Sequence, residues 1–233
     1  MNPQELRARL AEAGFHLYAE GGVRAYNEEL RSVDPAFILP EFGRENARVA
    51  LIGNGAELYD VIRCAARSDR ALRESADPID DYTKSRIERI ALEITIPHEL
   101  RFTFDAPPKT FAAVRLARAL GLAEMGPSML AIHPERGPYI ALRAAIVFDQ
   151  EGPPAQPLDS PCARCQPRPC IPAMNEAVAS VGGVKAMNRA SIKREVEAML
   201  RARTACPVGA AYRYPERLLR YHYLHDPALL FAE

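Results

Sequence analysis

A segment rich in proline and cysteine, residues 152–172, constrains the fold more than any other part of the sequence. It contains seven prolines and three cysteines. Proline fixes the backbone φ angle and has no N–H to donate, so this stretch can form neither a long helix nor a central strand. We therefore expect the chain to divide here. Residues 1–150 would form the main domain, and residues 151–233 a smaller appendage packed on it.

The sequence before this segment alternates between strand-like and helix-like patterns. Apolar runs and β-branched residues predict strands over 48–53, 92–96, 100–104, 129–132 and 140–148. Apolar residues at helical spacing predict helices over 57–67, 77–91 and 109–122, with one or two more within residues 1–31 and others over 176–180, 191–203 and 216–224. This mixture predicts an α+β sandwich of a sheet and helices.

The charge balance and the hydropathy pattern exclude several classes of protein. Lysine plus arginine equals aspartate plus glutamate at 30 each, so no overall field attracts nucleic acid or an anionic membrane. No window approaches the roughly 20 consecutive apolar residues of a membrane span, and the first ten residues do not resemble a signal peptide. We expect a cytoplasmic protein, in which clustered cysteines bind metal or do redox chemistry rather than form disulfides.

Four of the five cysteines form a pattern suited to one inorganic centre. Cys162 and Cys165 are separated by two residues, Cys170 follows closely, and Cys206 comes later with Pro207 directly after it. Three close ligands and one remote ligand before a proline are typical of a single-cluster ferredoxin. A structural zinc site is the alternative, although zinc sites usually combine two matched pairs. The fifth cysteine, Cys64, lies within a predicted helix, and we assign it no role.

Two regions resemble a known family. The motifs GFHLYAEGGVRAYNEEL, DPAFILP, ELYDVI and DPIDDY within residues 14–82, together with AIHPERGPYIALRAAIVF at 131–148, resemble the cobalamin-processing methylmalonic aciduria and homocystinuria type C family. The resemblance implies a nitroreductase-like α+β fold. It also implies binding of cobalamin with its lower base displaced, and removal of the upper ligand by reduction or by transfer to a thiol.

The same resemblance implies a set of cofactor-binding residues. A loop at 126–129 and a turn at 133–139 would face the corrin, and Arg143 resembles the arginine that binds the carboxylate of glutathione in that family. His133 suits a role in shaping the turn, since a histidine before proline in a loop is more often structural. The implied residues are Pro127, Ser128, Met129, His133, Pro134, Gly137, Pro138, Tyr139 and Arg143.

A second resemblance is to epoxyqueuosine reductase, which joins a similar domain to a ferredoxin domain with iron-sulfur clusters. It is carried by Asp105-Ala-Pro-Pro, residues 121–130, the His-Pro turn and Cys206-Pro-Val-Gly-Ala. It implies a small ferredoxin-like appendage and a proton donor at Asp105, although an aspartate after a strand is also an ordinary start of a loop. That enzyme has two clusters and acts on tRNA, whereas this chain has cysteines for one cluster and no net charge. Nucleic acid is therefore the less favoured partner.

These patterns lead to one functional hypothesis and two alternatives. The favoured hypothesis is an oxidoreductase that reduces or dealkylates cobalamin or a related corrinoid with an internal 4Fe-4S cluster, with a thiol or a flavin as electron donor. The first alternative is a non-catalytic cobalamin carrier with a structural zinc site. The second is a tRNA-modifying enzyme similar to epoxyqueuosine reductase.

Overall fold

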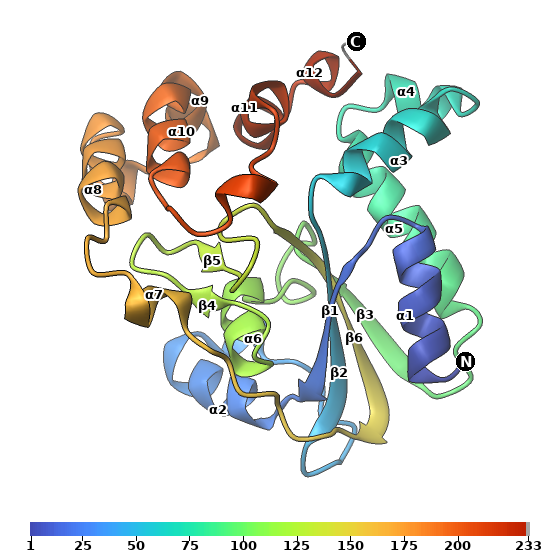
Figure 1. Ribbon diagram of the computed structural model, residues 1–233. Helices are drawn as coiled ribbons and strands as arrows, with labels where there is room; N and C mark the ends of the chain where they lie inside the picture. The colour runs from blue at the N-terminus through green and yellow to red at the C-terminus, as the bar shows by residue number, and fades with distance from the viewer. Residues whose placement is uncertain (232–233) are drawn as a thin grey trace.

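The fold is built around one antiparallel sheet, seen in a computed structural model that describes residues 1–231 (Figure 1). Its strands lie in the order β1 (Leu17–Gly22), β2 (Ala47–Asn54), β6 (Ala141–Glu151) and β3 (His98–Phe102). A separate ribbon of two short strands pairs β4 (Glu124–Met125) with β5 (Ala131–Ile132). β2 is buried along its whole length, as expected for an apolar strand at the centre of a sheet.

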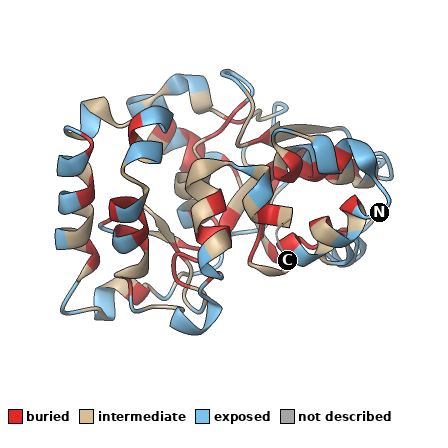
Figure 2. Cartoon of the chain, turned by 90° about the horizontal axis from the view of Figure 1, so that it is seen from above, coloured by how far each residue is buried: buried red, intermediate tan, exposed pale blue. Residues whose placement is uncertain are grey.

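Helices cover both faces of the sheet, because side chains along each strand alternate between the faces. Ile52 and Ile146 point to the face covered by α1 (Pro3–Glu12), α3 (Glu57–Ala66), α4 (Arg70–Glu74) and α5 (Pro78–Ala91). Leu51 and Val147 point to the face covered by α2 (Arg24–Val33), η1 (Pro35–Phe37) and α6 (Ala113–Ala119). The burial colours in Figure 2 show the inner sides of these helices buried and their outer sides exposed.

The rest of the described chain, residues 152–231, contains helices and loops but no strand. Its elements are α7 (Pro161–Arg164), α8 (Cys170–Ser180), η2 (Val184–Ala186), α9 (Arg189–Arg194), α10 (Val196–Thr204), η3 (Ala210–Tyr212), α11 (Glu216–Leu224) and α12 (Pro227–Phe231). Ala177 and Met199 belong to a small apolar cluster between α8 and α10. Leu218 and Leu230 instead join the main core beside α3 and α5.

Three elements differ from the sequence prediction. Residues 17–22, between the helices predicted within residues 1–31, form the strand β1, because they complete the edge of the sheet beside β2. Residues 92–96 are not a strand, since a turn closes α5 with the Ile94 N–H donating to the Ala91 carbonyl. The helix predicted over 109–122 is limited to 113–119, and it ends before Gly121, whose φ is +72°. Short apolar runs do not by themselves distinguish strand from helix.

Within residues 1–231, no helix has the length and apolar character needed to cross a membrane.

Candidate functional site

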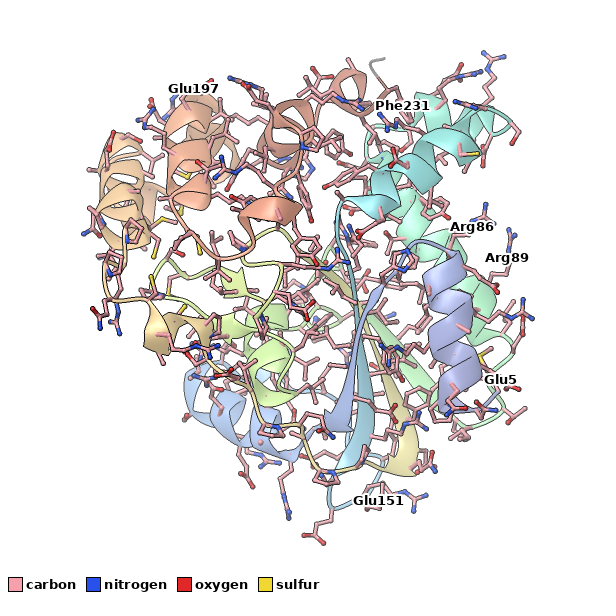
Figure 3. All side chains as sticks on the ribbon, viewed as in Figure 1. Glu5, Arg86, Arg89, Glu151, Glu197 and Phe231 are labelled. Carbon is pink, nitrogen blue, oxygen red and sulfur yellow. The ribbon has the colours of Figure 1, made fainter. Side chains whose placement is uncertain are left out.

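The appendage brings all four cysteines of the predicted centre into one neighbourhood. Cys162 lies in α7 and Cys165 ends it, Cys170 begins α8, and Cys206 follows α10. Burial raises the pKa of Cys162 and of Cys206, and smaller contributions come from the other three thiols at Cys162 and from Cys170 and Cys165 at Cys206. Such mutual effects require the sulfurs to be close together. Figure 3 shows sulfur atoms grouped where α7, α8 and the end of α10 meet.

Local sequence signals position these cysteines. Ser160 caps α7 by accepting the Ala163 N–H at 3.0 Å, and Pro161 occupies the first helical position. α10 packs against α8, and the chain that leaves α10 runs back toward the start of α8. Cys206 is buried there near the buried Cys170. Cys162 and Cys165 are half-buried, so one side of the group is nearer to solvent.

Within residues 1–231, no group of three or more His, Cys, Asp or Glu side chains is arranged to hold a single ion. Burial is the main cause that raises the pKa of Cys162 to about 11, followed by the nearby Glu124 carboxylate and the other thiols. The Cys162 thiol is therefore protonated at neutral pH, and a metal centre bound there would have to displace its proton.

One segment implied as cofactor-binding lies against Cys162, and the other lies against the residues that follow Cys206. A Cβ placed on Gly126 would lie 3.5 Å from Sγ of Cys162, so the 126–129 loop borders α7. A Cβ placed on Gly137 would lie only 1.9 Å from the Val208 carbonyl oxygen. The turn at 133–138 therefore packs its backbone on the segment that follows Cys206, an approach that only glycine allows.

A cavity of about 300 Å³ opens beside these two segments. Met129, Pro138 and Arg143, all implied by the resemblance, line it. Met129 has a φ of +62° and a side chain that is 65% exposed, so it stands at the open side. The structure adds three polar lining residues that the sequence did not indicate: Thr103, Arg203 and His222.

Two arginines give this cavity a positive character. Arg143 donates to the Asn54 amide oxygen at 2.7 Å and lies 3.8 Å from Asp80. Arg203 is 3% exposed and donates to the carbonyls of Pro138 at 2.5 Å and Ile140 at 3.3 Å. Its Nε has no hydrogen-bond partner within the described residues, and none of their ion pairs includes it. A buried guanidinium without a carboxylate partner favours an anionic group in the cavity.

His222 also borders this cavity and a smaller one, of about 170 Å³, that contains Asp80. Burial, with Arg203 and Arg143 nearby, holds the pKa of His222 well below its usual range, so the imidazole is neutral at neutral pH. Burial raises the pKa of Asp80, although Arg143 opposes the effect. No motif in the tail sequence distinguishes His222 from its aromatic neighbours, which is why sequence reasoning missed it.

Several implied residues lie away from the cavity lining. Nδ1 of His133 accepts the N–H groups of Glu135 and Arg136 at 3.2 and 3.3 Å, so His133 shapes the turn. Tyr139 is fully buried, and its hydroxyl accepts a bond from Arg213 at 3.0 Å. Asp105 accepts the Phe102 N–H at 3.1 Å and donates its own N–H to the Phe102 carbonyl at 3.2 Å, so it closes the turn that follows β3. The remaining implied residues occupy the two bordering segments: Pro127 exposed, Ser128 and Gly137 buried, and Pro134 half-buried.

The central antiparallel sheet with helices on both faces is a nitroreductase-like α+β sandwich. Solved structures share this architecture with the chain at low sequence identity. The first is "a C.elegans B12-trafficking protein CblC, a human MMACHC homologue", with a TM-score of 0.64 and 16% identity over 98% of this chain and 95% of that one. The sequence matches no protein-family model and no curated protein.

Epoxyqueuosine reductases share the fold as well. The enzyme from Streptococcus thermophilus gives a TM-score of 0.59 and 16% identity over 92% of this chain and 68% of that one. An epoxyqueuosine reductase solved with a modified tRNA-Tyr stem loop gives 0.52 and 12% identity over 97% of this chain and 69% of that one. At these identities the likeness establishes the fold, and the chemistry has to be argued from this chain's own residues.

Proposed function

We propose that this protein binds cobalamin or a related corrinoid and removes its upper ligand by reduction or dealkylation, using a 4Fe-4S cluster on Cys162, Cys165, Cys170 and Cys206. The observation that carries the proposal is the packing of the cavity's two bordering segments on the cysteines. Gly126 lies against Cys162, and Gly137 lies against the segment after Cys206. A redox centre on these thiols would therefore adjoin the cavity.

The spacing of the cysteines along the chain favours a cluster over zinc. Three of them lie within residues 162–170 and the fourth directly precedes Pro207, which is typical of a single-cluster ferredoxin. Structural zinc sites more often combine two matched pairs. When bound, such a cluster supplies electrons one at a time.

The residues of the cavity have separate roles in this proposal. Met129 and Pro138 offer apolar contact to the corrin. Arg143 and Arg203 bind an anionic group, and the carboxylate of a thiol co-substrate is one that would fit a guanidinium fork. The neutral His222 can accept a proton from such a thiol. The thiolate that remains is the nucleophilic form.

One alternative is favoured by a specific observation. Epoxyqueuosine reductases share the fold, and one of them was solved with a tRNA stem loop. Against a tRNA substrate stand the zero net charge and the position of Asp105, which caps a turn and does not line the cavity. The other alternative is a cobalamin carrier with structural zinc. It would bind cobalamin in the same cavity, and it differs from the proposal only in the metal that the cysteines hold.

Two measurements test the proposal. Protein purified without oxygen should contain iron and inorganic sulfide and show the broad visible absorption of a cluster, whereas stoichiometric zinc and no colour would favour the carrier. Titration with hydroxocobalamin should shift the corrin spectrum toward the base-off form. A spectrum that stays unchanged at saturating protein would remove cobalamin from the proposal. Salt-sensitive binding of tRNA would then favour a tRNA-modifying enzyme similar to epoxyqueuosine reductase.

A further inference from the structure

Two residues, Arg143 and His222, form the wall between the cavity of about 300 Å³ and the smaller cavity of about 170 Å³. Within residues 1–231 they are the lining residues that the two cavities share. The Arg143 guanidinium keeps its proton at every accessible pH. His222 has two ring nitrogens, so it can accept a proton on one side and donate one on the other. It is therefore the group through which a proton can pass from one cavity to the other.

The smaller cavity opens to solvent at its far end. The exposed fraction of its charged side chains rises from 12% at Arg143 to 28% at Asp80 and 42% at Asp77. A volume of about 170 Å³ holds several water molecules, and the two carboxylates are polar partners that keep such waters in place. A hydrated path thus leads from His222 to the surface of the protein.

The two carboxylates of this path keep acceptor sites for water. Oδ1 of Asp80 lies 3.8 Å from Nη1 of Arg143, which is longer than a direct hydrogen bond. Asp77 is the N-cap residue of α5, but its side chain makes no capping bond. It lies 3.4 Å from Nδ1 of His225, which also lines the cavity, and 3.7 Å from the exposed Arg189. Water can therefore join Asp80 to the groups at the surface.

The surroundings of Asp80 make its carboxylate a better proton acceptor than that of an ordinary aspartate. Burial raises the pKa of Asp80 above its usual value of 3.8. The carboxylates of Asp77 and Asp81 act in the same direction, whereas Arg143 and His225 oppose them. A carboxyl group with a raised pKa takes up a proton more readily as the pH approaches neutrality.

The surroundings of His222 make its imidazolium a strong proton donor. Burial holds the pKa of His222 well below 6.5, and Arg203 on α10, Arg143 on β6 and His225 at the end of α11 act in the same direction. An imidazolium formed there gives up its proton readily. Since the pKa of Asp80 is shifted the other way, the two shifts together favour movement of a proton from His222 to Asp80.

We propose that the smaller cavity is the proton exit of the site and that Asp80 carries the proton from His222 to solvent. When His222 takes the proton of a bound thiol, the S–H bond breaks and its electron pair stays on sulfur. The imidazolium then passes the proton through water to the Asp80 carboxylate, which releases it to solvent past Asp77. One proton leaves for each thiolate formed, and nothing is oxidised or reduced in this step. The thiol in the larger cavity belongs to the proposed function, on which this inference rests.

NMR of the full chain with isotope-labelled histidine, without corrinoid or thiol, tests the path directly. The measured quantity is the exchange rate of the His222 ring N–H with solvent, and His222→Gln identifies its signal. Asp80→Asn should slow this exchange by roughly tenfold or more, because an amide cannot accept the proton. Asp60→Asn is the matched control, since this exposed carboxylate on α3 lines neither cavity.

Two further variants separate proton transfer from an effect on structure. Asp80→Glu keeps a carboxylate and should retain most of the exchange. In Asp80→Ala, added formate should restore the exchange, because a small carboxylate can replace the missing one. Circular dichroism checks the fold of each variant, and a variant that does not fold leaves the others to decide. An exchange rate that Asp80→Asn leaves unchanged, or that Asp60→Asn lowers equally, overturns the proposal.

A kinetic measurement connects the path to the reaction. The rate of thiol-dependent removal of the upper ligand should fall in Asp80→Asn, most strongly at low buffer concentration, where solvent supplies few other proton acceptors. An unchanged rate under these conditions overturns the role of the exit in the reaction. A protein that binds no corrinoid contradicts the proposed function instead, and the exchange measurement still decides whether the proton path exists.

Discussion

At the residue scale, the cysteine thiols tie metal binding to pH. Burial raises the pKa of Cys162 to about 11 and also raises that of Cys206, where a Val208 N–H bond acts in the opposite direction. A metal binds the thiolate, so it must displace these protons. We expect reconstitution with iron and sulfide to become more complete as pH rises from 7 toward 9, measured as visible absorbance per protein. Incorporation that is independent of pH would contradict this coupling.

Substitution of single cysteines tests which thiols belong to the centre. Cys206→Ala removes the one ligand that comes from outside the 162–170 segment, and we expect iron content to fall severalfold, measured by metal analysis after anaerobic purification. Cys64→Ala is the matched control, since this exposed thiol lies on α3, away from the group. Equal iron in the two variants would exclude Cys206 as a ligand.

His222 makes stability depend on pH in a defined direction. Its folded-state pKa lies well below the usual 6.5, so the unfolded chain binds this proton more readily than the folded chain does. The contribution of the neutral His222 to the free energy of unfolding is fully present above pH 6.5, and it is lost as pH falls below that value toward the folded-state pKa. His222→Gln should therefore flatten the fall in unfolding free energy between pH 7 and pH 5, measured by urea titration. An unchanged slope would show that other groups cause it.

At the element scale, the contact between the 133–138 turn and the segment after Cys206 is the tightest connection between cavity and cysteines. Gly137→Ala would place a methyl group 1.9 Å from the Val208 oxygen at a φ of +56°. We expect a loss of about 2–4 kcal/mol of stability from overpacking and backbone strain, measured by urea denaturation. Gly43→Ala has a similar φ of +73° and nothing within 4 Å, so it should cost only about 1–2 kcal/mol. Equal losses would mean that the contact can relax.

At the scale of the whole molecule, the proposed centre would link separate segments of residues 152–231. Its cysteines come from α7, α8 and the segment after α10, while α11 and α12 pack on the main core. A ligand that binds only the folded state stabilises it, so removing iron with a chelator should lower the melting temperature of the wild-type protein by several degrees. The chelator should leave the Cys206→Ala variant unaffected. An equal shift in both would point to an effect outside the centre.

Much of the architecture follows from local sequence patterns. The apolar run at 48–53 predicts β2 and the run at 140–148 predicts β6, because a strand buried on both faces has no polar alternation. Asp77-Pro78 predicts the start of α5. β1 was missed since its residues Leu17–Gly22 have weak strand propensity, and pairing with β2 decides their conformation. No motif marks Arg203 and His222, because only the tertiary structure places them in the lining of the cavity.

The sequence by itself determined the α+β class, the irregular proline-rich segment after residue 151 and the spacing of the four cysteines. Hydrophobic period, proline geometry and cysteine spacing are all local properties of the chain. Only the tertiary structure decided which side chains share the cavity and that Gly126 and Gly137 lie against the cysteine segments. These contacts join residues far apart in the chain. They depend on how α10, β6 and the turns pack in three dimensions, which no local pattern encodes.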